Sequence, residues 1–293
     1  MHNVVGANCV RPSTWMIHLH GRTQFAPTGL CAAVWVFIYN TIIWQEVIFM
    51  YLANLMSGDL DRIKNEKIPI VIPIGTIEYH GPHCALGCDS YVSMGLLDKL
   101  AERKEIVIAP PVWYGVASYA VGGPENGTVH IDVDIYENYI YSILKSMLYG
   151  GFRNIYMVIH HQYEDGSLMP MTLACMKAAK KITMEYLEDV RGQGWWGSNA
   201  MKDYYDNLDG SDNPFNWIKT LCTMSPEVQK ATGYDHAGKF ECSILSALYP
   251  ECVDLSKIPT SDAWFIQSAV DASPELGAKM VELSLDDLEK KIQ

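Results

Sequence analysis

The chain has 293 residues, enough for one large α/β domain around a single core. Hydrophobic residues make up 49% of it and charged residues 19%, a balance that excludes an intrinsically disordered chain. The formal net charge of -12 argues against a nucleic-acid partner, because phosphate binding needs clustered Lys and Arg. A small neutral substrate remains compatible with this charge.

Residues 1–47 are interpreted as an atypical N-terminal extension. They contain a strongly apolar run at 28–44, which ends at Gln45-Glu46. A membrane-spanning helix needs ~20 such residues, and a signal peptide would start earlier and end in a small-residue cleavage site. We expect a packing extension and no membrane partner. A membrane anchor and a cleaved signal remain the alternatives.

From residue 59 the apolar spacing alternates between strand and helix patterns. Short β-branched runs bounded by Gly or Pro predict strands, and apolar residues three or four apart predict helices. Such alternation predicts an α/β fold of three α/β/α layers with a mainly parallel sheet. The predicted strands are 68–74, 105–110 and 154–159; the predicted helices are 59–65, 90–103, 134–149, 169–187, one ending at Leu248, and 274–293; segments 113–131 and 188–235 are expected to be irregular.

Side chains that can bind metal ions follow two of the predicted strands. Glu78 and His80 come after the first strand, and His160-His161 come directly after the third. In parallel sheets the ligand lies beyond the carboxyl ends of the strands. We therefore expect these side chains to share one site.

The segment from Gly75 to Asp89 offers metal ligands. Glu78 and His80 are two residues apart on an extended segment, so their side chains point the same way. Gly and Pro turns then allow Asp89 to fold back toward them. Carboxylates and imidazoles suit Zn, Mn or Fe(II), and one carboxylate can bridge two ions. A hydrogen-bonded loop without metal remains the alternative from these residues alone.

A second acid and imidazole, Asp235-His236, precede Glu241 at the start of a predicted helix. The chain contains no phosphate-binding loop, no dinucleotide-binding Gly motif and no Gly-x-Ser-x-Gly elbow. No Ser or Cys is singled out as a nucleophile. Metal-assisted hydrolysis is therefore the chemistry that these residues favour.

The eight cysteines are scattered, and none forms a Cys-x-x-Cys pair. A secreted disulfide scaffold is usually short and dense in Cys. The pattern indicates buried free thiols in a reducing compartment, so we expect a cytoplasmic protein. Thiolate ligation of a metal by Cys84 or Cys88 is an alternative use for these two residues.

Three segments together resemble the creatininase (creatinine amidohydrolase) family. The first is PIGTIEYHGPHCALGCD at 73–89, similar to that family's P-x-G-x-x-E-x-H-G-x-H signature followed by Asp. The second is FRNIYMVIHH at 152–161, and the third is DHAGKFECSILSALYP at 235–250. Gly127-Thr128 matches the family's central loop. The resemblance runs in order from about residue 48 to 257.

This resemblance implies a creatininase-like metallohydrolase domain at 48–293, assembled as a homohexamer around a binuclear metal site. It implies that the ligands are Glu78, His80, Asp89 and His161, with Asp89 as the bridge. A metal-bridging hydroxide would attack a small cyclic amide. His236 would carry the proton to the leaving nitrogen, a role that suits imidazole near neutral pH.

The chain departs from the family pattern around the substrate. Ile159-His160-His161 stands where the family has Asn-Gly-His, and Cys242 replaces a Thr. In creatininase itself, a glutamate two residues after that His also binds metal. Tyr163 stands at this position here. Either Glu164 reaches in or Glu241 completes the second ion's ligands, and we favour Glu241.

Glu164 and Trp196 are the candidate substrate-binding residues. Trp195-Trp196 lies between glycines and could form an aromatic lid, or could serve ordinary packing. The expected partner is a small-molecule substrate, and the expected cofactors are two divalent ions. The sequence favours a cyclic-amide hydrolase. A deformylase or other hydrolase of the family and a non-catalytic metal-binding homologue are the alternatives.

Overall fold

A computed structural model describes residues 50–163 and 168–293 of the chain. The extension at 1–47, its apolar run and Glu164 lie outside the described residues. Within the described ranges, no helix is both long and apolar enough to cross a membrane.

The centre of the fold is a five-stranded, fully parallel sheet with the strand order β1-β3-β2-β4-β5. β2 and β4 pair over their full lengths, from Ile70 opposite Ile155 to Ile74 opposite Ile159. The strands are β1 (Met50–Tyr51), β2 (Ile70–Ile74), β3 (Val107–Ile108), β4 (Ile155–Ile159) and β5 (Ile218–Cys222).

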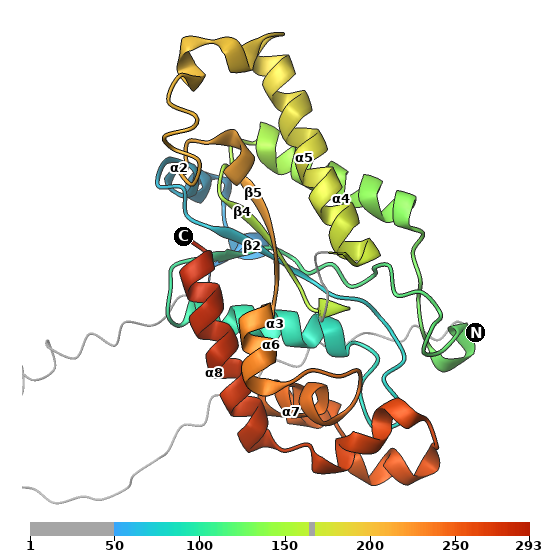
Figure 1. Ribbon diagram of the computed structural model, residues 1–293. Coiled ribbons are helices and arrows are strands. Elements are labelled where there is room, and N and C mark those ends of the chain that lie inside the picture. The colour runs from blue at the N-terminus through green and yellow to red at the C-terminus, as the bar shows by residue number, and fades with distance from the viewer. Residues whose placement is uncertain (1–49, 164–167) are drawn as a thin grey trace, which may run out of the picture. The chain divides into compact units, whose positions relative to one another are not determined.

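Helices cover both faces of this sheet (Figure 1). On one face α4 (Val133–Tyr149) packs against α5 (Pro170–Arg191). On the other face α7 (Lys239–Leu248) packs against both α3 (Cys88–Ala101) and α8 (Pro274–Lys291). Two shorter helices are α2 (Leu60–Asn65) and α6 (Pro226–Thr232). This arrangement confirms the predicted three-layer α/β/α class.

The sequence of β2 explains why both faces must be covered. Ile70, Ile72 and Ile74 join the core under α4 and α5, whereas Val71 joins the core under α3, α7 and α8. Successive side chains of a strand point to opposite faces, so an unbroken apolar run requires an apolar partner on each side. β4 follows the same rule, and all five of its residues are buried.

The prediction that 188–235 is irregular was wrong at β5 and α6, which both lie within it. β5 is an edge strand with the sequence IKTLC, and only Ile218 in it is fully buried. An edge strand keeps part of its surface in solvent, so it does not need the continuous apolar run that marks β2 and β4.

Gly75, directly after β2, allows the first turn of α3 to reach the end of the sheet. A Cβ atom at this position would lie 2.3 Å from the backbone nitrogen of Ser90 and 2.6 Å from the carbonyl carbon of Asp89. No L side chain fits into so close an approach of two backbones. The glycine therefore places Asp89 beside the carboxyl end of β2.

We predict that Gly75→Ala lowers the free energy of unfolding by about 1–3 kcal/mol, because the added methyl group forces two backbones apart. Urea unfolding followed by circular dichroism measures this loss. Gly197→Ala is the control, since a Cβ there meets nothing within 4 Å; it should change stability by less than about 0.5 kcal/mol. Equal effects of the two substitutions would contradict the close approach at Gly75.

Candidate metal centre

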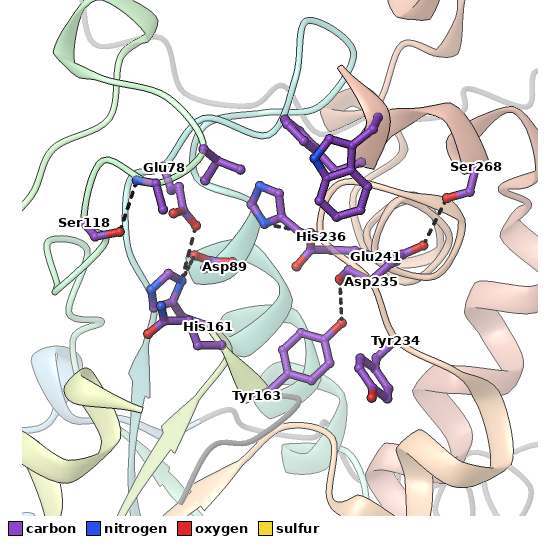
Figure 2. Close-up of a pocket in the computed structure, with 15 residues that line it drawn as sticks. Glu78, Asp89, Ser118, His161, Tyr163, Tyr234, Asp235, His236, Glu241 and Ser268 are labelled. Atoms are coloured by element: carbon purple, nitrogen blue, oxygen red, sulfur yellow. Dashed lines mark hydrogen bonds and ion pairs between the residues drawn. The ribbon is translucent and has the colours of Figure 1, made fainter. Parts of the chain in front are cut away.

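Five buried polar side chains converge at the carboxyl ends of β2 and β4, and Figure 2 labels four of them, Glu78, Asp89, His161 and Glu241. Glu78 and His80 follow β2, and His161 follows β4. Asp89 lies in the first turn of α3, and Glu241 lies in the first turn of α7. Residues spread over more than 160 positions of the chain thus meet where parallel strands end.

The loop that contains Thr128 supports the segment carrying Glu78 and His80. The Thr128 hydroxyl accepts a hydrogen bond from the Tyr79 amide at 3.1 Å, and the Val129 amide donates to the Ile77 carbonyl at 2.9 Å. These two bonds hold the segment extended, so Glu78 and His80 face the same side.

Asp89 joins two groups of potential ligands. Its Oδ1 lies 3.4 Å from Nε2 of His80, and its Oδ2 lies 3.0 Å from Nδ1 of His161. Glu241 Oε2 lies 3.5 Å from the same nitrogen of His80, and Glu78 Oε2 lies 3.4 Å from the same nitrogen of His161. Each imidazole therefore faces two carboxylates, and Asp89 belongs to both groups.

Backbone carbonyls fix which ring nitrogen of each histidine carries a proton. The Nδ1 of His80 lies 3.0 Å from the Glu78 carbonyl, and the Nε2 of His161 lies 3.1 Å from the Val116 carbonyl. A carbonyl oxygen can only accept, so both of these nitrogens donate. The other nitrogen of each ring is the one that faces the carboxylates, as in histidines that bind metal.

The spacing of these atoms fits divalent cations. In a tetrahedral zinc site with bonds of about 2.0–2.1 Å, neighbouring ligand atoms lie about 3.3–3.4 Å apart. Three of the four carboxylate–imidazole distances above are 3.4–3.5 Å, and the fourth is 3.0 Å. Moreover, Nε2 of His80 is fully buried and has no hydrogen-bond partner among the described residues. The donor set and its spacing therefore fit two ions that share Asp89.

The pKa shifts in the cluster also indicate that it favours a bound positive charge. Burial disfavours a charged His80, but the carboxylates of Glu241 and Asp89 outweigh burial and raise its pKa to about 10. Burial opposes ionisation of Glu241 too, yet the neighbouring His80 and His160 lower its pKa to about 2. The carboxylates therefore favour a positive charge at His80, and a bound metal ion would supply such a charge.

Cys88 is a further potential ligand. Its sulfur and one ligand atom each of His80, Asp89 and Glu241 all lie within 4.8 Å of one another. Burial raises the pKa of its thiol, so the thiol stays neutral unless a cation binds it. Cys84 and Cys242 are likewise buried free thiols.

His236 lies between this cluster and solvent. Its Nε2 is 3.1 Å from the Tyr79 carbonyl, and its Nδ1 is 3.9 Å from Oε2 of Glu241. Its ring lies 4.4 Å from that of His80, yet 29% of its side chain is exposed. It is therefore more exposed than His80, His160 or His161.

A cavity of about 600 Å³ opens over the cluster. The described residues that line the cavity include four Tyr, Trp and Phe side chains and no Lys or Arg. Trp264 is 85% exposed, and the ring of Phe265 lies 5.4 Å from that of His236. The lining comprises Glu78, Ser118, Ala120, Val121, Asp89, His161, Gln162, Tyr163, Tyr234, Asp235, His236, Glu241, Trp264, Phe265 and Ser268.

Sequence reasoning missed Trp264 and Phe265. They belong to a 3-10 helix, Trp264–Asp271, which follows the third family segment. An adjacent aromatic pair was the available signal, but the pair at Trp195-Trp196 carries the same signal. Trp196 is not among the described residues that line the cavity; it is 46% exposed, and its ring packs on Tyr204 at 5.8 Å.

Three non-glycine residues with left-handed backbone lie at this site. Ser118 (φ 61°) and Gln162 (φ 50°) line the cavity, and Ala237 (φ 53°) follows His236. The Ala237 turn directs its amide at Oε2 of Glu241, with a hydrogen bond of 2.6 Å. Strained backbone of this kind concentrates at functional sites, where the surrounding structure holds it in place.

Comparisons with known proteins identify the family of this chain. A family model described as Creatininase: Creatinine amidohydrolase matches residues 53–292. The chain therefore belongs to the creatininase family, and its class is that of a hydrolase.

Three relatives illustrate the likeness. Creatinine amidohydrolase of Pseudomonas putida is 22% identical over 227 residues, which cover 73% of each chain. The 3-dehydro-scyllo-inosose hydrolase of Thermotoga maritima is 25% identical over 192 residues, or 65% of this chain and 53% of that protein. A solved structure described as "Creatininase Mn" has a TM-score of 0.62 at 19% identity and covers 83% of this chain and 97% of that chain. The last comparison shows a shared fold.

Asp235 anchors the start of α7, and with it Glu241. Its carboxylate oxygens accept hydrogen bonds from the amides of Phe240 and Glu241 at 3.1 and 3.0 Å, as a helix cap does. We predict that Asp235→Ala lowers the free energy of unfolding by about 0.5–2 kcal/mol, measured in urea. Asp262→Ala is the control, because Asp262 is exposed; a loss as large in that variant would argue against the cap.

Proposed function

We propose that this protein is a metal-dependent amidohydrolase that cleaves a C–N bond of a small cyclic, creatinine-like amide. The observation that carries the proposal is the pair of carboxylate–imidazole groups that share Asp89 at the base of a cavity. His236 lines the same cavity. Membership of the creatininase family supports this reading.

Two divalent ions would bind at the base of the cavity. We propose that His80, Glu241 and Asp89 hold one ion and that Glu78, His161 and Asp89 hold the other. The donor set suits zinc, manganese or iron(II). When bound, such ions would lower the pKa of a coordinated water molecule and polarise a carbonyl oxygen.

We propose that His236 transfers the proton from the attacking water to the leaving nitrogen. Its Nε2 faces the Tyr79 carbonyl, which can only accept, so Nε2 carries a proton and Nδ1 is left with the lone pair. We assign Nδ1 as the atom that takes a proton from the attacking water and returns it to the leaving nitrogen.

The cavity lining supports a small neutral substrate. Tyr163, Tyr234, Trp264 and Phe265 offer flat apolar surfaces on which a planar ring can stack. Ser118 and Ser268 offer hydroxyl groups for its polar edge. No Lys or Arg occurs in the described lining, so away from the proposed ions no permanently cationic side chain would pair with a carboxylate or phosphate on the substrate.

A second candidate is hydrolysis of a different ring-derived substrate by the same residues. The likeness to the 3-dehydro-scyllo-inosose hydrolase favours it, and the lining hydroxyls suit a substrate rich in oxygen. A substrate panel of creatinine, another cyclic amide, a formamide and a cyclic polyhydroxy ketone separates the candidates by ring opening, formate release or ketone loss.

The cellular setting of the enzyme is also a proposal. We propose a homo-oligomer, a hexamer as the family resemblance implies, that works in the cytoplasm. The buried free thiols of Cys84, Cys88 and Cys175 support a reducing compartment.

We predict that turnover on this panel needs metal and Asp89. Dialysis against a chelator should abolish turnover, and Zn²⁺ or Mn²⁺ should restore it. Asp89→Asn should remove turnover and at least one of two bound ions per chain, counted by elemental analysis, because the bridge loses its charge. Asp271→Asn, an exposed acid elsewhere, should keep both ions. Full activity in the chelated sample would overturn the mechanism.

We predict that His236→Asn lowers kcat by about 10²–10⁴-fold, the usual contribution of a positioned general acid or base. Steady-state kinetics on the best panel substrate measures this loss. Elemental analysis of the variant should still find two ions, since His236 is not assigned as a ligand. Unchanged kcat in this variant would assign the proton transfer to another group.

A further inference from the structure

His160 is a second buried histidine at the carboxyl end of β4, and the proposed function leaves it without a role. Its side chain is fully buried. Its ring lies between three groups that belong to different parts of the chain: Thr223 after β5, the ring of Tyr163, and the carboxylate of Glu241. Buried polar atoms normally have hydrogen-bond partners, so each ring nitrogen of His160 is expected to have one.

The Nδ1 of His160 lies 2.6 Å from the hydroxyl oxygen of Thr223. The Nε2 lies 3.4 Å from Oε1 of Glu241 and, within the described ranges, has no hydrogen-bond partner of standard geometry. A carboxylate can only accept, whereas a hydroxyl can donate or accept. The arrangement that satisfies all three groups has Thr223 donating to Nδ1 and Nε2–H directed at Glu241.

The other oxygen of Glu241 is the one that faces the candidate ion position. Oε2 accepts the Ala237 amide at 2.6 Å and lies 3.5 Å from Nε2 of His80. The Ala237 amide thus holds the carboxylate at Oε2, and Nε2 of His160 faces Oε1 across 3.4 Å. An N–H of His160 directed at Oε1 would restrict rotation of the carboxylate and keep Oε2 aimed at the space between His80 and Asp89.

We propose that His160 is a positioning residue, oriented by Thr223, that fixes Glu241 as a ligand of the ion shared with His80 and Asp89. This inference rests on the proposed binuclear centre. Outer partners of this kind orient a ligand and raise its affinity for metal without touching the ion. The inference also gives a use to a histidine that stands where the family pattern has glycine.

A purely structural role for His160 has to be separated from this one. Its ring stacks on Tyr163, with centroids 4.4 Å apart and planes 27° apart, so the ring itself contributes packing. His160→Phe keeps an aromatic ring for this stack and removes both nitrogens. Thr223→Val keeps the branched shape of Thr223 and removes its hydroxyl, whereas Thr223→Ser keeps the hydroxyl.

The test is a Zn²⁺ titration of the metal-stripped full-length chain against a chromophoric chelator, which resolves two binding steps. In His160→Phe the affinity for one ion should fall about 10–100-fold, while the other ion, held by Glu78 and His161, binds as in the wild type. Thr223→Val should weaken the same step by a smaller factor. Thr223→Ser should match the wild type, because the hydroxyl that orients the ring is retained.

Glu241→Gln serves as the reference variant, because it alters the ligand itself. If Glu241→Gln weakens one ion and His160→Phe weakens neither, the positioning role is wrong and the binuclear centre stands. If the wild-type chain binds fewer than two ions, the proposed function fails first. A lower melting temperature in His160→Phe with both affinities unchanged would assign His160 to packing alone and would overturn the inference.

Discussion

Three carboxylates, those of Glu78, Asp89 and Glu241, are buried in one cluster in which Asp89 has an oxygen within 4.8 Å of an oxygen of each of the other two, and this unfavourable arrangement governs the rest of the structure. Removing a charged group from water costs several kcal/mol unless an opposite charge compensates it. His80 and His161 compensate part of the charge, and the neighbouring carboxylates raise the pKa of both imidazoles. Metal ions at the same positions would compensate it more completely.

The fold brings these carboxylates together and also lowers the cost of holding them. Asp89 and Glu241 both lie in the first turn of a helix, α3 and α7, where the amide ends of the helices carry partial positive charge. The close contact at Gly75 brings the start of α3 to the end of β2, and Asp235 holds the start of α7. Two helix ends and two strand ends therefore meet at one point, which no single segment could create.

The sequence predicted those strands whose residues are apolar along their whole length. β2 and β4 are buried on both faces, so their apolar runs were visible, and the residues after each strand were correctly expected at one edge of the sheet. β5 was missed because an edge strand needs no such run. The pairing of Glu241 with His80 is set by the packing of α7 and not by spacing along the chain. The sequence therefore favoured Glu241 as the remaining metal ligand but kept Glu164 as an alternative.

The left-handed backbone at Ser118, Gln162 and Ala237 has a consequence for how this protein would respond to engineering. Such a conformation costs roughly 1 kcal/mol for a residue with a Cβ and little for glycine. A selection for heat resistance that is blind to turnover would therefore enrich glycine at these positions. At Ser118 and Gln162 that change would also remove a side chain that lines the cavity, so a gain in melting temperature there would alter the substrate's surroundings.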